Sequence, residues 1–462
     1  MKRTIVCIFV IIVVTSCVLN NSGKSSKNSS IYTNPQSNNN GITFFFTGNI
    51  QGSLKPCGCS GGQLGGLDRR PAVFNSVPKQ KRLLIDTGSI VETDSEQDLI
   101  KFSIIMQAFN MLEYDVVNLT RKDIEIAQSV GMLGYSEVNF ISAFGADEEI
   151  ADGYQNEFLL NGEHIIVSVV TLDLDSTPIE FISEAFPQET GKKNINILII
   201  NKNDDSITSS ISEMDIVDCL ICPPEYDEPI ILNDPDAKLL AFSVGKDGRY
   251  ICLLQINTIP NEDNLNLSFS YIPVSEDIEQ DIDLINLYKD YQQIVKAQNL
   301  LEKHPKFPLP DGLRYIGSES CKSADCHEDP YIHQYEYVIW SDNPKTSGEQ
   351  HSHAYETLVE VGSQYDPECI VCHVVGYDYE SGFISEEKTP QLKNVGCEYC
   401  HGPGSKHYEN PYKYPTTPIA DRLEICKKCH TPEHDGDFAG NEEEKLEIIN
   451  HWPEPNEVSN VK

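Results

Sequence analysis

Near the C-terminus the chain repeats one pattern three times: Cys369-Ile-Val-Cys372-His373, Cys397-Glu-Tyr-Cys400-His401 and Cys426-Lys-Lys-Cys429-His430. A variant with a longer gap precedes them, Cys321-Lys-Ser-Ala-Asp-Cys326-His327. In this pattern two thiols attach covalently to a haem and the adjacent His binds its iron. One such pentapeptide can arise by chance, but a cluster of four predicts four covalently bound haem c groups. The predicted proximal iron ligands are His327, His373, His401 and His430.

Histidine is concentrated in the same region, since ten of the 12 His follow residue 320. A second His on the opposite side of an iron gives a six-coordinate electron-transfer haem. Six His remain for these distal positions: His333, His351, His353, His407, His434 and His451. Because residues 313–455 are few for four haems, the haems themselves must form much of the core. We expect a mainly helical and irregular domain here, with no extensive sheet.

The composition narrows the classes of partner. The chain has 462 residues with 35 basic and 71 acidic side chains, a formal net charge of −36. Such acidity argues against nucleic acid or an anionic lipid surface as partner. It either keeps the protein soluble or provides a docking face for basic redox partner proteins.

The N-terminus is typical of an exported lipoprotein. Residues 1–17 have a basic start and a short apolar run that ends in Val14-Thr15-Ser16-Cys17. Small residues before Cys17 resemble a bacterial lipobox, in which this Cys is lipidated and anchors the protein to a membrane; an ordinary secretory signal is the alternative. Residues 18–41 are rich in Asn and Ser and predict a flexible tether. We expect an extracytoplasmic, periplasmic-side location, and Val18 resembles outer-membrane sorting.

Residues 42–274 alternate strand-like and helix-like segments, which predicts an α/β layered domain. Ser275–Glu302 shows helical periodicity, and with the Pro-rich stretch that follows it forms a linker over 275–312. The short segment 456–462 is a tail. The predicted strands are Ile42–Thr47, Arg82–Asp86, Asp115–Leu119, Asn139–Ala143, His164–Leu172, Ile195–Asn201, Ile216–Cys222, Lys238–Val244, Tyr250–Asn257 and Leu265–Ile272, and Glu96–Leu112 and Ile207–Glu213 are predicted helices.

Several stretches of this domain resemble the metallophosphatase domain of the 5′-nucleotidase family: ITFFFTGNIQG (42–52), LGGLDRR (64–70), LLIDTGS (83–89), FNMLEYDVVNL (109–119), NILIIN (196–201) and IVDCLICPP (216–224). The resemblance implies an α/β sandwich. That family binds two metals through Asp-x-His, Gly-Asp, Gly-Asn-His-Glu and two further His. The corresponding positions here read Asn49-Ile-Gln51, Gly88-Ser89, Thr120-Arg-Lys-Asp123, Asn201-Lys202 and Pro223-Pro224-Glu225. Asp86 is the one carboxylate in a plausible place. We therefore expect the fold without phosphoester hydrolysis, because two metals need a clustered ligand set.

Five cysteines lie between the N-terminal segment and the haem motifs. Cys57 and Cys59 flank a single Gly. They form a redox pair, a strained disulfide or a soft-metal site, or else they form structural disulfides to other cysteines or lie in an inert loop. Cys219 and Cys222 have haem-like spacing, but Pro223 stands in place of His. On a strand, positions three apart face opposite sides, so we expect these two and Cys252 to be core residues, with a cross-strand disulfide as an alternative.

The haem region resembles the tetrahaem cytochrome family of ammonia-oxidising bacteria, whose members take electrons from hydroxylamine oxidoreductase. The matching residues are Trp340, HSHAYETL (351–358), Asp366-Pro-Glu-Cys369 and VGCEYCHGPGSKH (395–407). The resemblance implies distal ligands at His407, at His451 and at one of His351 and His353, of which His351 is preferred. His333 and His434 are either ligands or surface residues. In that family the second haem has an open iron site, which here would be the haem of His373.

Together these features predict a membrane-anchored multihaem c-type cytochrome that transfers electrons. The alternative is a multihaem oxidoreductase that acts on a small nitrogen or sulfur compound at an open haem or at the Cys57/Cys59 loop. The two hypotheses differ in whether one iron lacks a distal His. The α/β domain could also bind a ligand or partner protein and bring it to the haems.

Overall fold

The computed structural model describes residues 41–56, 61–133, 137–145, 150–186, 192–234, 237–258, 265–322, 326–327, 336–342, 351–416, 422–431 and 434–451. Several predicted features lie outside these residues. They are the signal segment with Cys17, the tether before residue 41, the pair Cys57 and Cys59, His333, and the tail 456–462.

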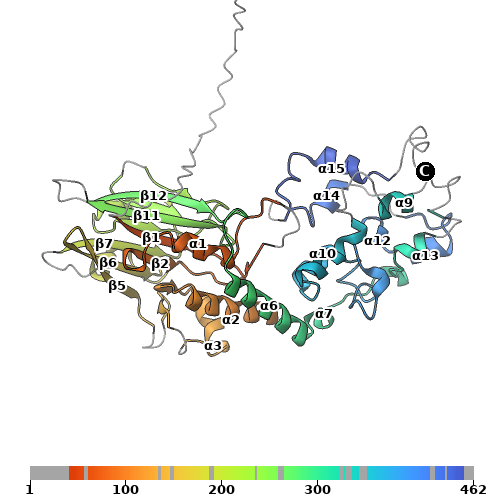
Figure 1. Cartoon of the computed structure of the whole chain (residues 1–462), viewed down its shortest axis with the longest axis horizontal. Coiled ribbons are helices and arrows are strands. Elements are labelled where there is room, and N and C mark those ends of the chain that lie inside the picture. The colour runs from red at the N-terminus through yellow and green to blue at the C-terminus, as the bar shows by residue number, and fades with distance from the viewer. Residues whose placement is uncertain are drawn as a thin grey trace, which may run out of the picture.

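Two mixed β-sheets pack face to face in the N-terminal part of the chain (Figure 1). The first has the order β12-β11-β1-β2-β3-β4, and the second the order β5-β6-β7-β8-β10-β9. β1 to β4 run parallel, as do β6, β7, β8 and β10, and the remaining strands pair antiparallel. The strands are β1 Ile42–Thr47, β2 Arg82–Asp86, β3 Val116–Asn118, β4 Asn139–Ile141, β5 Gly153–Leu160, β6 Glu163–Leu172, β7 Lys193–Ile200, β8 Cys219–Ile221, β9 Ile230–Ile231, β10 Leu240–Ser243, β11 Tyr250–Thr258 and β12 Leu265–Pro273.

The sequence of β1 shows why both faces of the first sheet are covered. All six of its residues are buried, as expected for a strand between two layers. Because successive side chains alternate, Phe44 and Phe46 pack between the two sheets while Phe45 packs under the helices. A third apolar cluster, which includes Leu198 and Ile211, lies on the outer face of the second sheet. The four layers confirm the predicted α/β sandwich.

The helices of this part mostly begin at capping residues. The hydroxyl of Ser95 accepts from Asp98 N at the start of α2, and Thr120 with Asp123 forms a capping box at α3. The helices are α1 Arg70–Phe74, α2 Glu96–Met111, α3 Arg121–Ser129, α4 Ile182–Ala185, α5 Asp205–Glu213, α6 Ile282–Gln298 and α7 Leu300–Lys303, with 3₁₀ turns η1 Leu67–Arg69, η2 Lys79–Lys81 and η3 Ile179–Phe181.

The prediction of one helix over Ser275–Glu302 is wrong at its start and near its end. α6 begins only after Asp281, whose carboxylate accepts hydrogen bonds from Asp283 N and Leu284 N. Asn299 adopts a left-handed conformation with φ 55° and separates α6 from α7. Such a residue ends an α-helix because its backbone cannot continue the right-handed turn.

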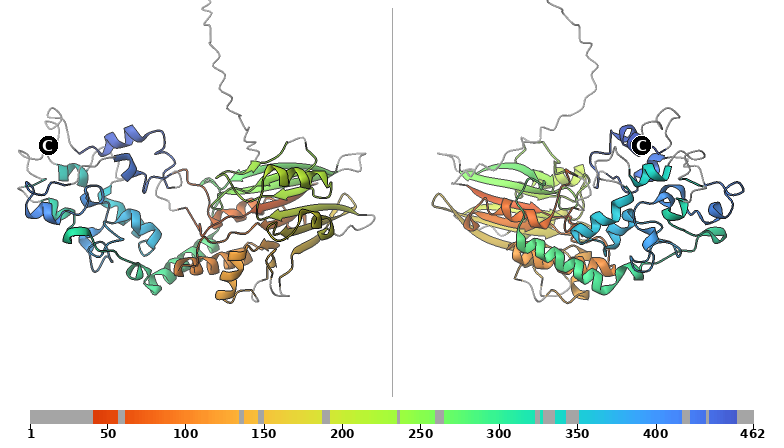
Figure 2. Two further views of the ribbon diagram at one scale, coloured as in Figure 1. Left: turned by 180° about the vertical axis from the view of Figure 1, so that it is seen from behind. Right: turned by 45° about the vertical axis from the view of Figure 1, so that its right-hand side comes forward.

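The C-terminal part is built from short helices and irregular segments (Figure 2). Among its described residues the strand-like pairings are the isolated bridges Phe307–Tyr379 and Val374–Lys393. This agrees with the expected helical domain. The helices are α8 Ser318–Cys321, α9 Glu336–Ser341, α10 Ala354–Val361, α11 Pro367–His373, α12 Cys397–His401, α13 Ser405–Glu409, α14 Arg422–Cys426 and α15 Glu442–Ile449, with 3₁₀ turns η4 Pro310–Gly312, η5 His351–His353 and η6 Pro390–Leu392.

The segment after α6 is built into the C-terminal part (Figures 1 and 2). Leu301 is buried in the same apolar cluster as Tyr377 and Ile370. The ring of His304 stacks on Tyr377 at 4.3 Å, and its Nε2 lies 2.8 Å from the carboxylate of Asp378. These contacts make residues 300–307 a packed connection between the two parts. None of the helices in the described ranges has the length and hydropathy that a bilayer crossing requires.

Candidate haem-binding site

The four Cys-His motifs are carried by short helices. α11 ends with the second motif, α12 consists of the third, and α8 and α14 end at the first Cys of the first and fourth. Within a helix, positions three and four apart lie on one face, so in α11 and α12 both Cys and the His of the motif face the same side. The eight motif cysteines have intermediate exposure. They are therefore accessible for attachment to haem vinyl groups.

Three predicted proximal His face three of the predicted distal His. The ring centres are 6.3 Å apart for His327 and His407, 6.1 Å for His430 and His351, and 5.9 Å for His401 and His451. With metal–imidazole bonds of about 2 Å and roughly 1.1 Å from ring nitrogen to ring centre, two imidazoles on one iron have ring centres about 6 Å apart. The three spacings fit an iron between each pair.

Five of the predicted haem ligands have an acceptor at Nδ1, which leaves their Nε2 for a metal. His327 Nδ1 lies 3.3 Å from Glu336 Oε2, and His430 Nδ1 lies 2.7 Å from Asp435 Oδ2. His407, His451 and His373 use backbone oxygens of Tyr414, Ile449 and Ala354. A hydrogen bond at the second ring nitrogen is the usual way to fix the tautomer and orientation of a metal-binding His.

Burial keeps two of the predicted iron ligands, His351 and His373, in the neutral form that binds iron. Desolvation, followed by the nearby His430 and His373, lowers the pKa of His351 to about 4. Burial likewise lowers the pKa of His373. The neutral imidazole is the ligating form, so both side chains are ready to ligate at neutral pH. In contrast, the carboxylate of Glu336 raises the pKa of His327.

A cavity of about 300 Å³ joins the first and third motifs. This size is within the range of pockets that hold organic cofactors. Its polar lining includes thiols and imidazoles beside hydroxyl and carboxylate groups, and its apolar wall includes Trp340, Val395 and Ile449. The motif residues and distal candidates that line it are Cys321, Cys326, His327, Cys397, Cys400, His401, His351, His407 and His451. This set of donors and walls fits covalently bound haem.

Thiol contacts bring the motifs together in a defined order. Cys321 is hydrogen-bonded to Cys397, so the first motif lies beside the third. Cys372 is hydrogen-bonded to Cys429, so the second motif lies beside the fourth. Tyr399, inside the third motif, places its hydroxyl 3.0 Å from Cys429 Sγ. The first motif therefore lies beside the third, the third beside the fourth, and the fourth beside the second.

The remaining candidates occupy other positions. His353 Nδ1 lies 3.0 Å from Ser352 Oγ, next to His351 on η5. His434 Nδ1 lies 3.0 Å from Thr431 Oγ1, and His434 is close enough to affect the pKa of His373 by charge repulsion.

The sequence did not reveal several carboxylates that support the motifs. Besides Asp435 and Glu336, Glu398 in the third motif is buried and accepts from the backbone nitrogens of Ile316, Gly317 and Gly404. A Glu at the first x of the motif would be the only local signal, because its partners lie up to 82 residues away.

The two parts of the chain meet at the second motif. Asp366, at the N-terminus of α11, is buried and accepts hydrogen bonds from Gln97 Nε2 at 2.8 Å and Tyr291 Oη at 3.0 Å. The buried Lys101 pairs with Glu368 at 2.5 Å. A second contact joins Gln63 Nε2 to the backbone oxygen of His434 at 2.9 Å. The α/β part thus contacts the second and fourth motifs.

The positions expected to have lost metal ligands take part in internal hydrogen bonds. Asn49 Nδ2 donates to Gly245 O, and Asp123 accepts from Ser89 N and Ile90 N. Asn201 Nδ2 donates to Asp173 at 2.6 Å. In the part of the chain that the structure describes, no three His, Cys, Asp or Glu are grouped to hold a metal ion.

Asp86 is a fully buried carboxylate of this region. It accepts from Thr47 Oγ1 at 2.7 Å and Gly88 N at 3.0 Å. Burial raises the pKa of Asp86 to about 6, an effect that the charge of Arg70 opposes. Arg70 donates to Tyr114 Oη, which lies 2.7 Å from Thr47 Oγ1. The group is therefore a buried polar network.

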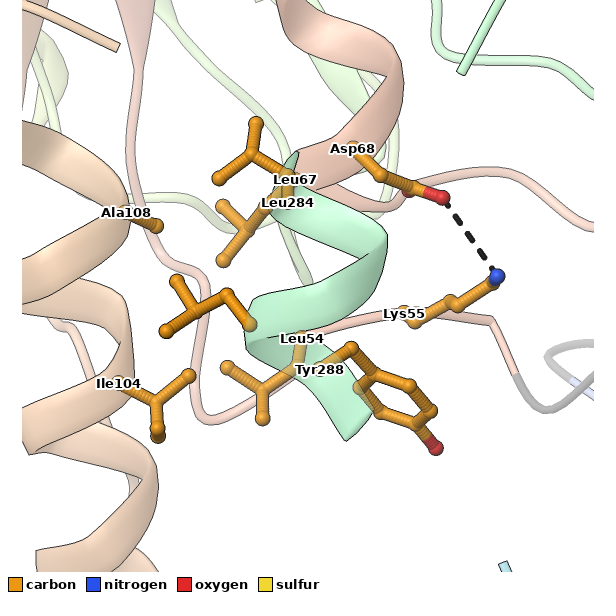
Figure 3. A pocket seen from close by; sticks show the side chains of 9 residues that line it. Leu54, Lys55, Leu67, Asp68, Ile104, Ala108, Leu284 and Tyr288 are labelled. Carbon is orange, nitrogen blue, oxygen red and sulfur yellow. Dashed lines mark ion pairs between the residues drawn. The ribbon is translucent and has the colours of Figure 1, made fainter. Parts of the chain in front are cut away.

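A small pocket between α2 and α6 lies on the helical side of the first sheet (Figure 3). Ile104, Leu284 and Leu54 line it, and Lys55 and Asp68 form an ion pair of 3.5 Å at its edge. Its volume of about 10 Å³ has room for a single water molecule, so it cannot accept a substrate.

The three cysteines of the second sheet and β11 are buried free thiols. Cys219 and Cys252 lie between the sheets, whereas Cys222 lies in the outer cluster. This confirms that Cys219 and Cys222 face opposite sides. Burial raises the pKa of Cys222 to about 12, so the thiol is unreactive.

Part of the haem region matches a known protein family. A family model described as cytochrome c554 and c-prime matches residues 320–402. Cytochrome c-554 of Nitrosomonas europaea is 49% identical over 39 residues, 8% of this chain and 17% of that protein. The chain thus matches only about a sixth of that relative's length.

The α/β part is similar to solved phosphoesterases. The 5′-nucleotidase precursor from Thermus thermophilus is 13% identical with a TM-score of 0.43, over 58% of this chain and 61% of that chain. The calcineurin-like phosphoesterase YfkN from Bacillus subtilis is 11% identical with a TM-score of 0.42, over 55% and 97%. The C-terminal part of the chain contains a cytochrome c554 domain, as its Cys-His motifs and the family match show. Domains of this type bind haem c covalently.

Proposed function

We propose that this protein is an extracytoplasmic electron-transfer cytochrome with four covalently bound haem c groups, anchored to a membrane through a lipid on Cys17. The single observation that carries the electron-transfer role is the set of three imidazole pairs with ring centres 5.9 to 6.3 Å apart. Two axial His close an iron to substrates and favour one-electron transfer. In this proposal His407, His351 and His451 are the distal ligands of the first, fourth and third haems.

The contacts between neighbouring motifs support an electron path in the order first, third, fourth and second. The protein's role along this path is to fix ligation, spacing and solvent exposure. Glu398 and Tyr399 hold the third motif against its neighbours. The net charge of −36 supports docking of a donor or acceptor protein with a basic face.

A catalytic alternative is favoured by one contact. Gln63 lies shortly after Cys57 and Cys59 in the chain, and its side chain donates to the backbone of His434 beside the fourth motif. This contact places Gln63 beside the fourth motif, while Cys57 and Cys59 themselves lie outside the described residues. A redox pair at Cys57 and Cys59, or an open site at the haem of His373, would make the protein an oxidoreductase for a small nitrogen or sulfur compound. An added nitric oxide ligand should shift the spectrum only if one haem is open.

The pairing of ligands is tested with two neighbouring variants. His351→Ala should convert one haem from low-spin to high-spin in electron paramagnetic resonance, because the fourth iron loses its distal imidazole. His353→Ala is the matched control two residues away and should leave the fourth haem low-spin. A high-spin signal from His353→Ala together with an unchanged His351→Ala spectrum would contradict the proposed pairing.

A further inference from the structure

The haem ligand His430 has an anionic hydrogen-bond partner. Asp435 Oδ2 lies 2.7 Å from His430 Nδ1, a separation typical of a charge-assisted hydrogen bond. Phe438 stacks on the imidazole with ring centres 4.9 Å apart and planes at 22°. The His430 ring is therefore held by the segment that follows its own motif, with His351 opposite.

Two of the other proximal His have a different contact at Nδ1. His373 Nδ1 contacts the neutral backbone oxygen of Ala354. His327 Nδ1 lies 3.3 Å from the carboxylate of Glu336, which is longer than the usual range for such bonds. An anionic acceptor at Nδ1 increases the basicity of the coordinating nitrogen and so stabilises ferric over ferrous iron. Asp435 supplies the strongest such effect in this set.

Asp435 is fixed from two sides. Its backbone nitrogen donates to Thr431 O at 2.8 Å, and its backbone oxygen accepts from Phe438 N at 3.1 Å. Its side chain is only 14% exposed. The adjacent residue His434 accepts through its backbone oxygen from Gln63 Nε2 of the α/β part.

Gln63 is itself held firmly. It is buried, and its backbone oxygen accepts from Arg69 Nη1 at 3.2 Å. The same guanidinium nitrogen also binds Gly65 O and Val274 O. The α/β part thus fixes the turn that carries the carboxylate.

We propose that Asp435 is a positioning residue that lowers the midpoint potential of the haem at Cys426 and Cys429 below that of the haem at Cys369 and Cys372, and that Gln63 keeps it in place. Reduction adds one electron to the iron, while the Nδ1 proton stays in the hydrogen bond to Asp435. The α/β domain would then set the potential at one step of the electron path. This inference rests on the proposed haem attachment.

The test is a spectroelectrochemical titration of the full-length holoprotein. Asp435→Asn should raise one of the four midpoint potentials and leave the others as in the wild type. Asp437→Asn is the matched control. It also removes one negative charge, two residues after Asp435, but the side chain of Asp437 is 81% exposed. It should shift no potential, because water screens its charge. Asp435→Glu keeps the carboxylate and should stay closer to the wild type than Asp435→Asn, and Gln63→Leu should raise the same potential by less.

The outcomes separate the two proposals. If intact mass shows no haem on Cys426 and Cys429, the proposed function fails. If all haems are attached and Asp435→Asn shifts no midpoint potential, or shifts it no more than Asp437→Asn does, the inference about Asp435 is overturned. Should Asp435→Asn fail to bind four haems, Gln63→Leu decides the role of the α/β domain. An unchanged set of potentials in that variant would overturn this role, and a rise confined to one potential would support it.

Discussion

The replacement of Tyr291 by Phe tests how the α/β domain is joined to the second haem motif. Tyr291 is buried on α6, and its hydroxyl donates to Asp366 Oδ2 at 3.0 Å and accepts from Gln97 Nε2 at 2.9 Å. Burial, followed by the charges of Asp366 and Glu368, raises the pKa of Tyr291 far above its usual value. The hydroxyl is therefore protonated at neutral pH and acts as a donor to the carboxylate.

The expected cost follows from the kind of hydrogen bond that is lost. A hydrogen bond to a charged group contributes about 1.5–3 kcal/mol to stability. Phe keeps the ring in the apolar cluster below the first sheet, and Gln97 Nε2 retains its bond to Asp366 Oδ1 at 2.8 Å. Tyr291→Phe should therefore lower the free energy of unfolding by about 2 kcal/mol, with little change from packing.

The control is Tyr288→Phe, one turn earlier on the same helix. Its hydroxyl contacts Ser363 Oγ at 3.2 Å and Gln292 Nε2 at 2.9 Å. Since both partners are neutral, the loss should be about 0.5–1.5 kcal/mol.

Urea unfolding of the holoprotein, followed by circular dichroism and by haem absorbance, measures both variants. If Tyr291→Phe lowers the free energy of unfolding by no more than Tyr288→Phe does, the hydrogen bond from Tyr291 to Asp366 does not have the strength expected of a bond to a charged group.

Three further predictions concern other parts of the chain. The pKa of Asp86 is raised from 3.8 in the unfolded chain to about 6 in the folded protein, so the free energy of unfolding falls as the pH rises between these values. The free energy of unfolding of Asp86→Asn should therefore gain about 3 kcal/mol relative to the wild type between roughly pH 4 and pH 7. Parallel curves of stability against pH for the two proteins would refute this. Cys17→Ala should release the protein from membranes into the soluble fraction, and continued membrane binding would rule out the lipid anchor. Added Mn²⁺ or Zn²⁺ should give no nucleotidase or phosphodiesterase activity, and metal-dependent turnover that purifies with the protein would show that a phosphoesterase site survives.

Much of the α/β domain could be predicted because its signals are local. The three consecutive phenylalanines of β1 and runs of Val, Ile and Leu identify strands buried on two faces. β5 was missed, since Gly153–Leu160 has exposed polar residues on an edge strand and lacks a continuous apolar run. The break at Asn299 was missed as well, because the apolar periodicity continues across it.

In the haem region, the motifs can be predicted from the sequence but the contacts between them cannot. The Cys-His motifs and the surplus of His indicate haem attachment and axial ligation from the sequence alone. The partners of those ligands depend on contacts between distant segments, such as His430 with His351, and periodicity does not predict them. The same holds for Asp366, whose donors Gln97 and Tyr291 lie 269 and 75 residues away in the chain.

The number of covalent haems is the most direct test of the proposed function. Intact mass spectrometry of the mature holoprotein, with digestion to locate the modified cysteines, counts covalent haems one motif at a time. We expect four covalent haems, including one on the longer Cys321 and Cys326 motif. A protein produced with full haem-attachment machinery that carries fewer than four would contradict it.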